Sequence, residues 1–419
     1  MVEKTEEKIR ELTPEEELHA FVQYLQKNYS CDFVESVVVS KQTKVEALEA
    51  FAKSKYDSTR EAVLKSKYVT PEIVDSLSED EYASIRSIVA IKTKNIEILR
   101  KLSKDDSLRV LYNVAVNLNT PGEILDEIAK RKMGGSRFLN SALFINIVEN
   151  KNVEMDTLYF LCDCDDEGVL ARIARLPNLR TDIYEKLASS NNLHALETLA
   201  EQPSSNLSIL EKIAENEEID DDVYYCIAGN ANADSKLLKS IFESGCCGVN
   251  DPISRNPNTS TELLAILAFD ENNYVRRNVA RHEHTNAETL EILANDIIMD
   301  VRLNVAIHEN TSAITLKKLS TDISSSVRKA VANHKNTPAE VLPSLAKDTE
   351  RDISLAAILH PNMPARTLKK YAKSKDWIIR RAVVNNPSTP RDILEALAKD
   401  SDSDVKELAI IRLSEMQKP

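Results

Sequence analysis

Residues 327–348 read VRKAVANHKNTPAEVLPSLAKD, and the same arrangement of residue types returns every 26 residues through the C-terminal part of the chain. A Val-Arg pair opens the row, a Thr-Pro pair stands near its middle, and Leu and Asp follow. Row follows row without a gap from Asn256 to Lys406. Self-similarity at a period of this length indicates a solenoid, in which each unit packs only on its neighbours.

Each row contains the signals of two helices. Thr337-Pro338 supplies a hydroxyl for the N-cap and a proline for the first helical position, and a stripe of apolar residues at helical spacing follows. A second apolar stripe covers residues 326–333. The sequence therefore predicts an all-α fold in which every unit is a helix pair, of roughly 10 residues after Thr-Pro and 8 residues at Val-Arg.

The remainder of the chain carries a weaker form of the same row. Degenerate rows can be followed from about residue 42, which gives about fourteen units. Residues 1–30 fit no row and are amphipathic, with Leu18, Phe21, Val22 and Leu25 at helical spacing. We therefore divide the chain into an N-terminal helical cap at 1–30, degenerate repeats at 31–250, and regular repeats with a C-terminal cap at 251–419. Insertions at 130–137 and 215–222 lengthen two rows, and we expect them to form loops.

The row, most clearly in residues 381–390 (RAVVNNPSTP) and 255–259 (RNPNT), resembles the leucine-rich repeat variant family. The resemblance is strong over 250–410 and can be traced from about residue 40. It implies a right-handed superhelix of helix pairs, related to HEAT-like arrays that serve as interaction scaffolds. Some members carry an iron–sulfur cluster in a cysteine-rich N-terminal segment, but Cys31 is the first cysteine here and the next is Cys162. We therefore expect no cofactor.

Composition narrows the functional classes. The net charge of −13 argues against general affinity for nucleic acid or an anionic membrane. No apolar run is long enough for a membrane-spanning helix, and the N-terminus does not read as a signal peptide. The expectations are a cytoplasmic, monomeric protein with no membrane association. Charge is uneven, since residues 151–250 hold 8 basic and 19 acidic side chains whereas residues 251–419 hold 24 and 23.

Three polar columns invite a functional interpretation. Four imidazoles in successive rows could form a metal array, but layers about 8–10 Å apart place them too far from one ion. Asn256 and Asn386 occupy the same column, which favours a hydrogen bond to the turn backbone. Each Arg is expected to pair with an Asp, either six residues upstream or in the adjoining unit. We interpret all three columns as structural: Arg276, Arg302, Arg328 and Arg380; Asp270, Asp296, Asp322 and Asp348; His282, His308, His334 and His360.

Catalytic and metal motifs are weak. The chain has no Walker A, nucleophile elbow, H-E-x-x-H or kinase signature. Cys162-Asp-Cys164 and Cys246-Cys247 lie about three units apart, on the order of 25–30 Å along a regular solenoid, so we expect separate thiols and no metal site. A HEAT-like glycosylase acting on alkylated bases would need a basic face and aromatic side chains. This chain has one tryptophan, Trp377.

The sequence therefore predicts a non-enzymatic scaffold that binds a protein partner. The alternative is a HEAT-like nucleic-acid-binding or DNA-repair protein that uses the arginine columns. The places where the 26-residue rule breaks are the candidates for specificity, because a basic partner segment would bind acidic residues and an acidic one would bind the basic insertion. The candidate partner-binding residues are Lys130, Arg131, Lys132, Arg137, Glu217, Glu218, Asp220, Asp221 and Asp222.

Overall fold

The computed structural model describes residues 14–40, 43–133, 137–164 and 166–416. Within these ranges the regular elements are α-helices, thirty in all, and no strand occurs. The prediction of an all-α solenoid built from helix pairs is confirmed. The chain forms two compact units, of which the first runs to Ser205 and includes residues 215–218, and the second comprises residues 206–214 and those from Ile219 onward.

Within the segment predicted as a helical cap, the described part is one helix and the start of the next turn, and residues 1–13 lie outside the described residues. Helix α1 starts at Pro14 and packs on α2 and α3, with Val22 and Leu25 buried. Phe21, expected on the same apolar face, is 53% exposed, because α2 and α3 cover only a narrow stripe of α1. The helices of this unit are α1 (Pro14–Asn28), α2 (Cys31–Val38), α3 (Val45–Ala52), α4 (Asp57–Lys65), α5 (Pro71–Ser76), α6 (Ala83–Lys92), α7 (Ile96–Leu102), α8 (Leu108–Val116), α9 (Gly122–Lys132), α10 (Arg137–Glu149), α11 (Met155–Leu161), α12 (Glu167–Ala174), α13 (Thr181–Ala188) and α14 (Leu193–Glu201).

The second unit contains the regular rows. From α19 onward, helices of 7 and 9 residues alternate, except for the shorter α25 and the longer terminal α30. Its helices are α15 (Leu207–Ala214), α16 (Asp221–Gly229), α17 (Ser235–Glu243), α18 (Asn250–Arg255), α19 (Thr261–Leu267), α20 (Asn273–Arg281), α21 (Ala287–Leu293), α22 (Met299–Ile307), α23 (Ala313–Leu319), α24 (Ser325–Asn333), α25 (Leu342–Leu345), α26 (Arg351–Leu359), α27 (Ala365–Tyr371), α28 (Trp377–Asn385), α29 (Arg391–Leu397) and α30 (Ser403–Glu415).

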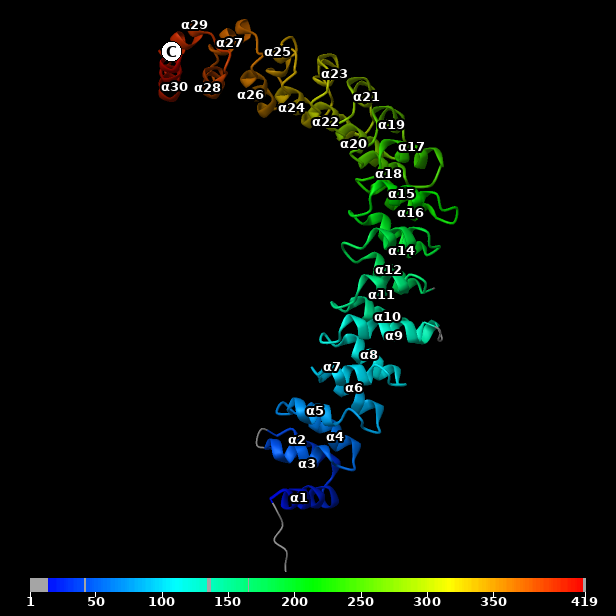
Figure 1. The fold of residues 1–419 in the computed structure, drawn as a ribbon. Helices are drawn as coiled ribbons and strands as arrows, with labels where there is room; N and C mark the ends of the chain where they lie inside the picture. The colour runs from blue at the N-terminus through cyan, green and yellow to red at the C-terminus, as the bar shows by residue number, and fades with distance from the viewer. Residues whose placement is uncertain (1–13, 41–42, 134–136, 165, 417–419) are drawn as a thin grey trace, which may run out of the picture. The chain divides into compact units, whose positions relative to one another are not determined.

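The 9-residue helices form one row, in which α20, α22, α24, α26 and α28 each pack on the next (Figure 1). The 7-residue helices α19, α21 and α23 pack on the helix that follows each of them. The core lies between the two rows. In one repeat it consists of Val301, Val305 and Ala306 from α22 with Leu316 and Leu319 from α23, none more than 2% exposed. The valine and leucine columns of the sequence are thus the buried faces of the two helices.

The predicted order of helix lengths is wrong, and a threonine contact explains why. In α21 the N-cap is Asn286, whose side chain accepts the amide of Thr289. Thr285, one residue earlier, donates its hydroxyl to the carbonyl of Val279 at 2.6 Å and so closes the end of the preceding helix. Thr337 does the same to Val331. The threonine column therefore ends the Val-Arg helix, and the helix after it begins later and is shorter than predicted.

The basic insertion at 130–137 was predicted as a loop, but its described part is helical, and residues 134–136 lie outside the described residues. Lys130, Arg131 and Lys132 form the last turn of α9, and Arg137 begins α10. These helices are 11 and 13 residues long, so the extra residues extend both helices of that pair. The insertion at 215–222 does form a loop, from Glu215 to Asp220, before α16 begins.

Candidate interaction surfaces

Each regular repeat presents two sets of loops. We call the loops 268–272, 294–298, 320–324, 346–350, 372–376 and 398–402 the Asp edge, because each carries the aspartate column or its serine replacement. We call the loops 282–286, 308–312, 334–338, 360–364 and 386–390 the His edge, because each begins with the histidine column or Asn386. Every 9-residue helix runs from the Asp edge to the His edge.

The histidine column forms a hydrogen-bond ladder along the His edge. His308 approaches the carbonyl oxygen of His282 in the previous repeat with its Nε2 at 2.9 Å, and its Nδ1 lies 3.1 Å from the amide nitrogen of Asn310. The same pair of contacts is made at His282, His334 and His360. Each rung thus joins two successive turns of the His edge.

Asparagine makes the same contacts at both ends of this ladder. Asn386 donates its Nδ2 to the carbonyl of His360 at 2.9 Å, and its Oδ1 accepts the amide of Ser388. Asn256 bonds in the same way to the carbonyl of Asn230 and the amide of Asn258. The interchange of His and Asn in the sequence therefore has a direct cause, since both side chains offer one donor and one acceptor at similar positions.

This geometry fixes the protonation state of the imidazoles. Because Nδ1 accepts a backbone N–H, the proton of the neutral ring lies on Nε2, where it is donated to the carbonyl. A second proton on Nδ1 would face the amide hydrogen. Burial lowers the pKa of His282 and His334 below the ordinary value of 6.5, although the hydrogen bond to the carbonyl acts in the opposite direction.

The arginine and aspartate columns form a second ladder along the Asp edge. Arg302 donates Nε and Nη2 to the two carboxylate oxygens of Asp322 in the next loop of the Asp edge, and Nη1 to the carbonyl of Asp296 in the loop before α22. Arg276, Arg328 and Arg380 repeat this arrangement with Asp296, Asp348 and Asp400. Asp270, the first of the column, instead accepts a hydrogen bond from Asn250.

The ladder is nearly buried. The Arg302 and Asp322 side chains are 13% and 7% exposed. Burial tends to raise the pKa of Asp322, but hydrogen bonds from Arg302 and the Ser324 amide outweigh it and the pKa is lowered. The hydrogen bond to Asp322 raises the pKa of Arg302. These guanidinium groups are therefore committed to neighbouring repeats, and little of them is offered to a ligand.

One rung is replaced by hydroxyl groups. Ser354 and Ser374 stand where the pattern requires Arg and Asp. The Ser354 hydroxyl donates to the carbonyl of Ala346 at 2.8 Å, and the hydroxyl of Tyr371 donates to the same carbonyl at 2.8 Å. Tyr371 occupies a position that is leucine in the other regular repeats, so three changes in one repeat compensate one another.

Two further rungs, missed in the sequence, lie in the first unit. Arg60 donates to both carboxylate oxygens of Asp80 at 2.6 and 2.9 Å, and Arg86 makes the same contacts with Asp105. The Arg60 side chain is only 8% exposed. An Arg followed by Asp 20 or 19 residues later is the signal that would have found them, because the regular ladder uses a spacing of 20.

The basic candidates are mostly held within the fold. Lys130 forms an ion pair with Asp126 at 2.6 Å, which raises the pKa of the lysine. Arg131 donates to the carbonyls of Ser103 and Asp105 in the previous repeat. Lys132 ends α9, and its carbonyl accepts a hydrogen bond from Asn140. Arg137 begins α10, but its side chain lies outside the described residues.

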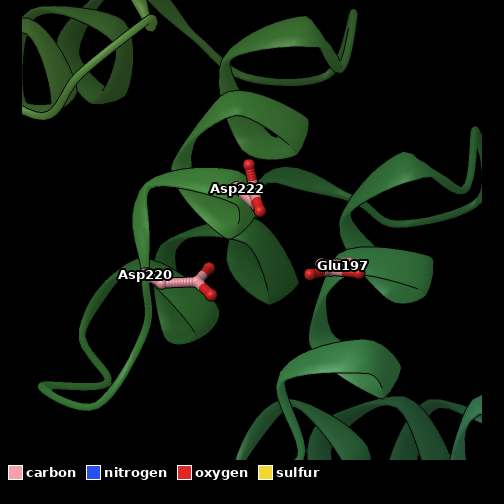
Figure 2. A group of neighbouring side chains, drawn as sticks. All are labelled: Glu197, Asp220 and Asp222. Atoms are coloured by element: carbon pink, nitrogen blue, oxygen red, sulfur yellow. The ribbon is translucent and has the colours of Figure 1, made fainter.

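The acidic candidates are exposed. Glu217 and Glu218 lie in the loop before α16 and belong to the first unit. Asp220, Asp221 and Asp222 lie at the start of α16 in the second unit, and Figure 2 shows the carboxylates of Asp220 and Asp222 there. Asp220 is the N-cap and accepts the amide of Val223 at 3.1 Å. Glu197, also labelled in Figure 2, belongs to α14 of the first unit.

The six cysteines lie in diverse environments. Cys31 and Cys247 are exposed, Cys164 is buried, and the other three are intermediate. Burial raises the pKa of Cys162 to about 12, which is partly opposed by Lys186. Cys162 is therefore a thiol that resists ionisation at neutral pH.

Among the helices in the described ranges, none has the length and apolar character needed to cross a membrane.

Comparison with known proteins finds a family that one repeat matches and several solved structures that resemble the chain. The family described as leucine rich repeat variant matches residues 377–402. No curated protein matches the chain. Similar solved structures include a leucine-rich repeat variant with a novel repetitive structural motif, at 20% identity and a TM-score of 0.34 over 60% of this chain and 88% of that one. Another is Kap121p bound to Ste12p, at 12% identity and a TM-score of 0.31 over 88% and 48%. A third is the Pds5–Scc1 complex, at 13% identity and a TM-score of 0.25 over 97% and 72%.

Proposed function

Because one row of this solenoid, residues 377–402, matches the leucine rich repeat variant family, we propose that the chain is a non-enzymatic scaffold that binds a protein partner along the exposed surface of its solenoid. The regular polar columns hold successive repeats together. Recognition then falls to exposed side chains that differ from repeat to repeat. A partner that contacts several repeats at once reads a series of such positions.

The observation that carries this proposal is the contrast between the two ladders and the segment 217–222. Arginine and histidine side chains of the ladders are buried or nearly so and bond to neighbouring repeats. Glu217, Glu218, Asp221 and Asp222 are exposed, and none of them forms an ion pair in the described part of the chain. This concentration of negative charge would attract a basic segment of a partner and accelerate its association.

The arrangement also bears on the nucleic-acid alternative. That reading relied on arginine columns facing outward to contact phosphates. Each of these arginines bonds instead to an aspartate in the next loop of the Asp edge and to backbone carbonyls of the loop before its own helix: Arg276, Arg302, Arg328 and Arg380. A phosphate would have to replace these bonds, at the cost of leaving a nearly buried carboxylate unpaired.

The experiment is a quantitative capture of partners by the full chain and by a charge-reversed variant. Glu217, Glu218, Asp221 and Asp222 are changed to Lys together, while Asp220 is kept because it caps α16. The wild-type chain is expected to retain a protein that the variant loses. Retention of the same proteins by both chains would contradict a role for this segment.

A matched control separates local recognition from overall charge. It reverses four other exposed carboxylates with no ion pair in the described structure, namely Glu283, Glu288, Glu291 and Asp300. The control is expected to retain the partner at the wild-type level. A nucleic acid recovered by the wild-type chain, with affinity for duplex DNA that falls steeply between about 50 and 200 mM salt, would favour the alternative function.

A further inference from the structure

The Asp edge has an outer surface that the ladder does not use. Asp296, Asp322, Asp348 and Asp400 turn their carboxylates inward to an arginine. Asp270 bonds instead to Asn250, and Ser374 takes the place of the remaining aspartate. In every loop the residues immediately before and after this position are left at the surface. These flanking residues are exposed in all six loops: Phe269, Glu271, Asn295, Ile297, Thr321, Ile323, Lys347, Thr349, Lys373, Lys375, Lys399 and Ser401. Together they form a strip that runs along the second unit.

The first half of the strip is apolar. Phe269, Ile297 and Ile323 are 69%, 87% and 93% exposed, one in each of three successive repeats. Ile266 and Ile292, on the adjoining 7-residue helices, are also exposed. Phe269 precedes its aspartate whereas Ile297 and Ile323 follow theirs, so three successive loops each expose one large apolar side chain beside the ladder. Exposed apolar side chains gathered in this way are typical of interaction surfaces. The ladder does not require them, because Lys375 and Ser401 occupy the position of Ile297 in later repeats without loss of the Arg380–Asp400 pair.

The second half of the strip is basic. In the last three repeats the position of Phe269 is occupied by Lys347, Lys373 and Lys399, and Lys375 lies two residues after Lys373. All four are exposed, and none forms an ion pair in the part of the chain that the structure describes. Other exposed lysines of this unit do pair, as Lys317 does with Glu340, Lys329 with Asp352 and Lys369 with Asp392. The strip therefore carries uncompensated positive charge.

We propose that the strip binds an extended segment of a partner protein that has apolar residues in one half and acidic residues in the other. Layers about 8–10 Å apart match three residues of an extended chain at about 3.3 Å each. The partner would therefore place one side chain on each repeat at every third position. Apolar side chains would contact Phe269, Ile297 and Ile323, and carboxylates would contact Lys347, Lys373 and Lys399.

This binding surface is separate from the acidic segment at 217–222, so the inference goes beyond the proposed function. Reversal of the acidic segment leaves every residue of the strip unchanged. Either proposal can therefore fail while the other holds, and the two sets of variants distinguish the failures.

The test uses a labelled peptide of about sixteen residues and fluorescence anisotropy with the full chain. The peptide has leucine at every third position of one half and glutamate at every third position of the other, and is made in both directions. Binding of one direction at micromolar affinity is expected. A peptide of the same composition with leucine and glutamate at every second position is expected to bind at least about tenfold more weakly. Equal affinity for both spacings would overturn the proposal.

Three variants locate the contact. Ile297→Ser with Ile323→Ser, and separately Lys347→Glu with Lys373→Glu and Lys399→Glu, are each expected to weaken binding at least about tenfold. Ile307→Ser is the matched control, because Ile307 is 59% exposed at the far end of α22. It is expected to leave binding unchanged. Thermal unfolding by circular dichroism checks that all three variants fold as the wild type does.

Two other ligands of the strip, duplex DNA and a second copy of the chain, would give different results in these binding measurements. Duplex DNA that binds more tightly than the peptide, and loses affinity in the lysine variant but not in the isoleucine variant, would overturn the proposal in favour of a phosphate backbone. Concentration-dependent association of the chain with itself, abolished by Ile297→Ser with Ile323→Ser, would overturn it in favour of a second copy.

Discussion

Arg302 donates two hydrogen bonds to the carboxylate of Asp322 in the following loop of the Asp edge, at 2.7 and 3.0 Å, and its remaining guanidinium nitrogen bonds to the carbonyl of Asp296 at 2.8 Å. One side chain thus links α22 to the loop before it and to the loop after α23. Because each repeat contacts mainly its neighbours, the stability of a solenoid depends on such interface contacts. The ladder is a structural device, and predictions about it can be separated from predictions about binding.

Removal of Arg302 is expected to destabilise this repeat interface. Arg302→Ala leaves the nearly buried carboxylate of Asp322 without its partner, which costs about 3 kcal/mol of the free energy of unfolding. Lys329→Ala is the control, since its ion pair with Asp352 is exposed and contributes less than about 1 kcal/mol. Urea unfolding measures both, and hydrogen exchange in α22 and α24 locates the effect. Equal losses in the two variants would contradict the ladder's role.

The missing rung can be repaired only by a concerted change. Ser354→Arg, Tyr371→Leu and Ser374→Asp together restore the pattern of the neighbouring repeats, and are expected to raise the free energy of unfolding by about 1 kcal/mol. Ser354→Arg alone is expected to lower it, because the guanidinium would meet Ser374 and Tyr371 in place of a carboxylate. Comparison of the urea midpoints checks the sign. A stabilising single variant would show that the hydroxyl contacts to Ala346 do not compensate for the missing pair.

The His edge is expected to make stability depend on pH. The pKa values of His282 and His334 are lowered by burial, so unfolded histidine takes up protons below about 6.5 that the folded state does not bind. The contribution of these histidines to the free energy of unfolding is then fully present above about pH 6.5. It is lost as the pH falls through their lowered pKa values in the folded state. The lowered pKa of Asp322 also makes stability depend on pH, but only at lower pH, as the pH falls below the ordinary aspartate value of 3.8. Urea midpoints between pH 8 and 5 measure the slope.

Asparagine provides the control for this pH dependence. His334→Asn keeps a donor to the carbonyl of His308 and an acceptor for the amide of Asn336, as Asn386 does in its own repeat. The substitution is expected to reduce the slope of stability with pH while leaving the chain folded at pH 8. An unchanged slope would show that His334 contributes nothing to it.

The thiols are expected to differ in reactivity. Cys31 and Cys247 are exposed and should react with iodoacetamide in the native protein. Cys162, whose pKa is raised to about 12, and the buried Cys164 should react only after unfolding. Mass spectrometry of labelled peptides measures each site. Rapid labelling of Cys162 in the folded protein would contradict its assignment as a partly buried, un-ionised thiol.

The regular period made the architecture predictable from sequence. Valine and leucine columns such as Val301 and Leu316 identify buried helix faces directly, because burial imposes the same residue type in every row. The roles within a turn were harder to assign. Thr285 and Asn286 are adjacent and both can cap a helix, so the pattern alone did not show that the first ends one helix and the second begins the next.

The candidate surfaces were less predictable for a different reason. The sequence predicts a loop for the insertion at 130–137, because extra residues in a repeat usually fall between elements. In the structure Lys130, Arg131 and Lys132 extend α9, and Arg137 begins α10. Ile297 and Ile323 share a column with Glu271 and Lys375, so no residue type recurs there. The variation of residue type at this position indicates that it is exposed. Only the structure shows that Asp296 and Asp322 face the arginines, which leaves Ile297 and Ile323 on the outer surface of the Asp edge.

Lysine footprinting of a purified partner complex tests the central claim that this solenoid binds protein through exposed positions outside its ladders. Acetylation of the chain alone and in the complex is compared residue by residue. The account predicts protection of Lys347, Lys373 and Lys399, with Lys317, Lys329 and Lys369 labelled equally in both states. Protection of the second group without the first, or the recovery of no protein complex, would contradict it.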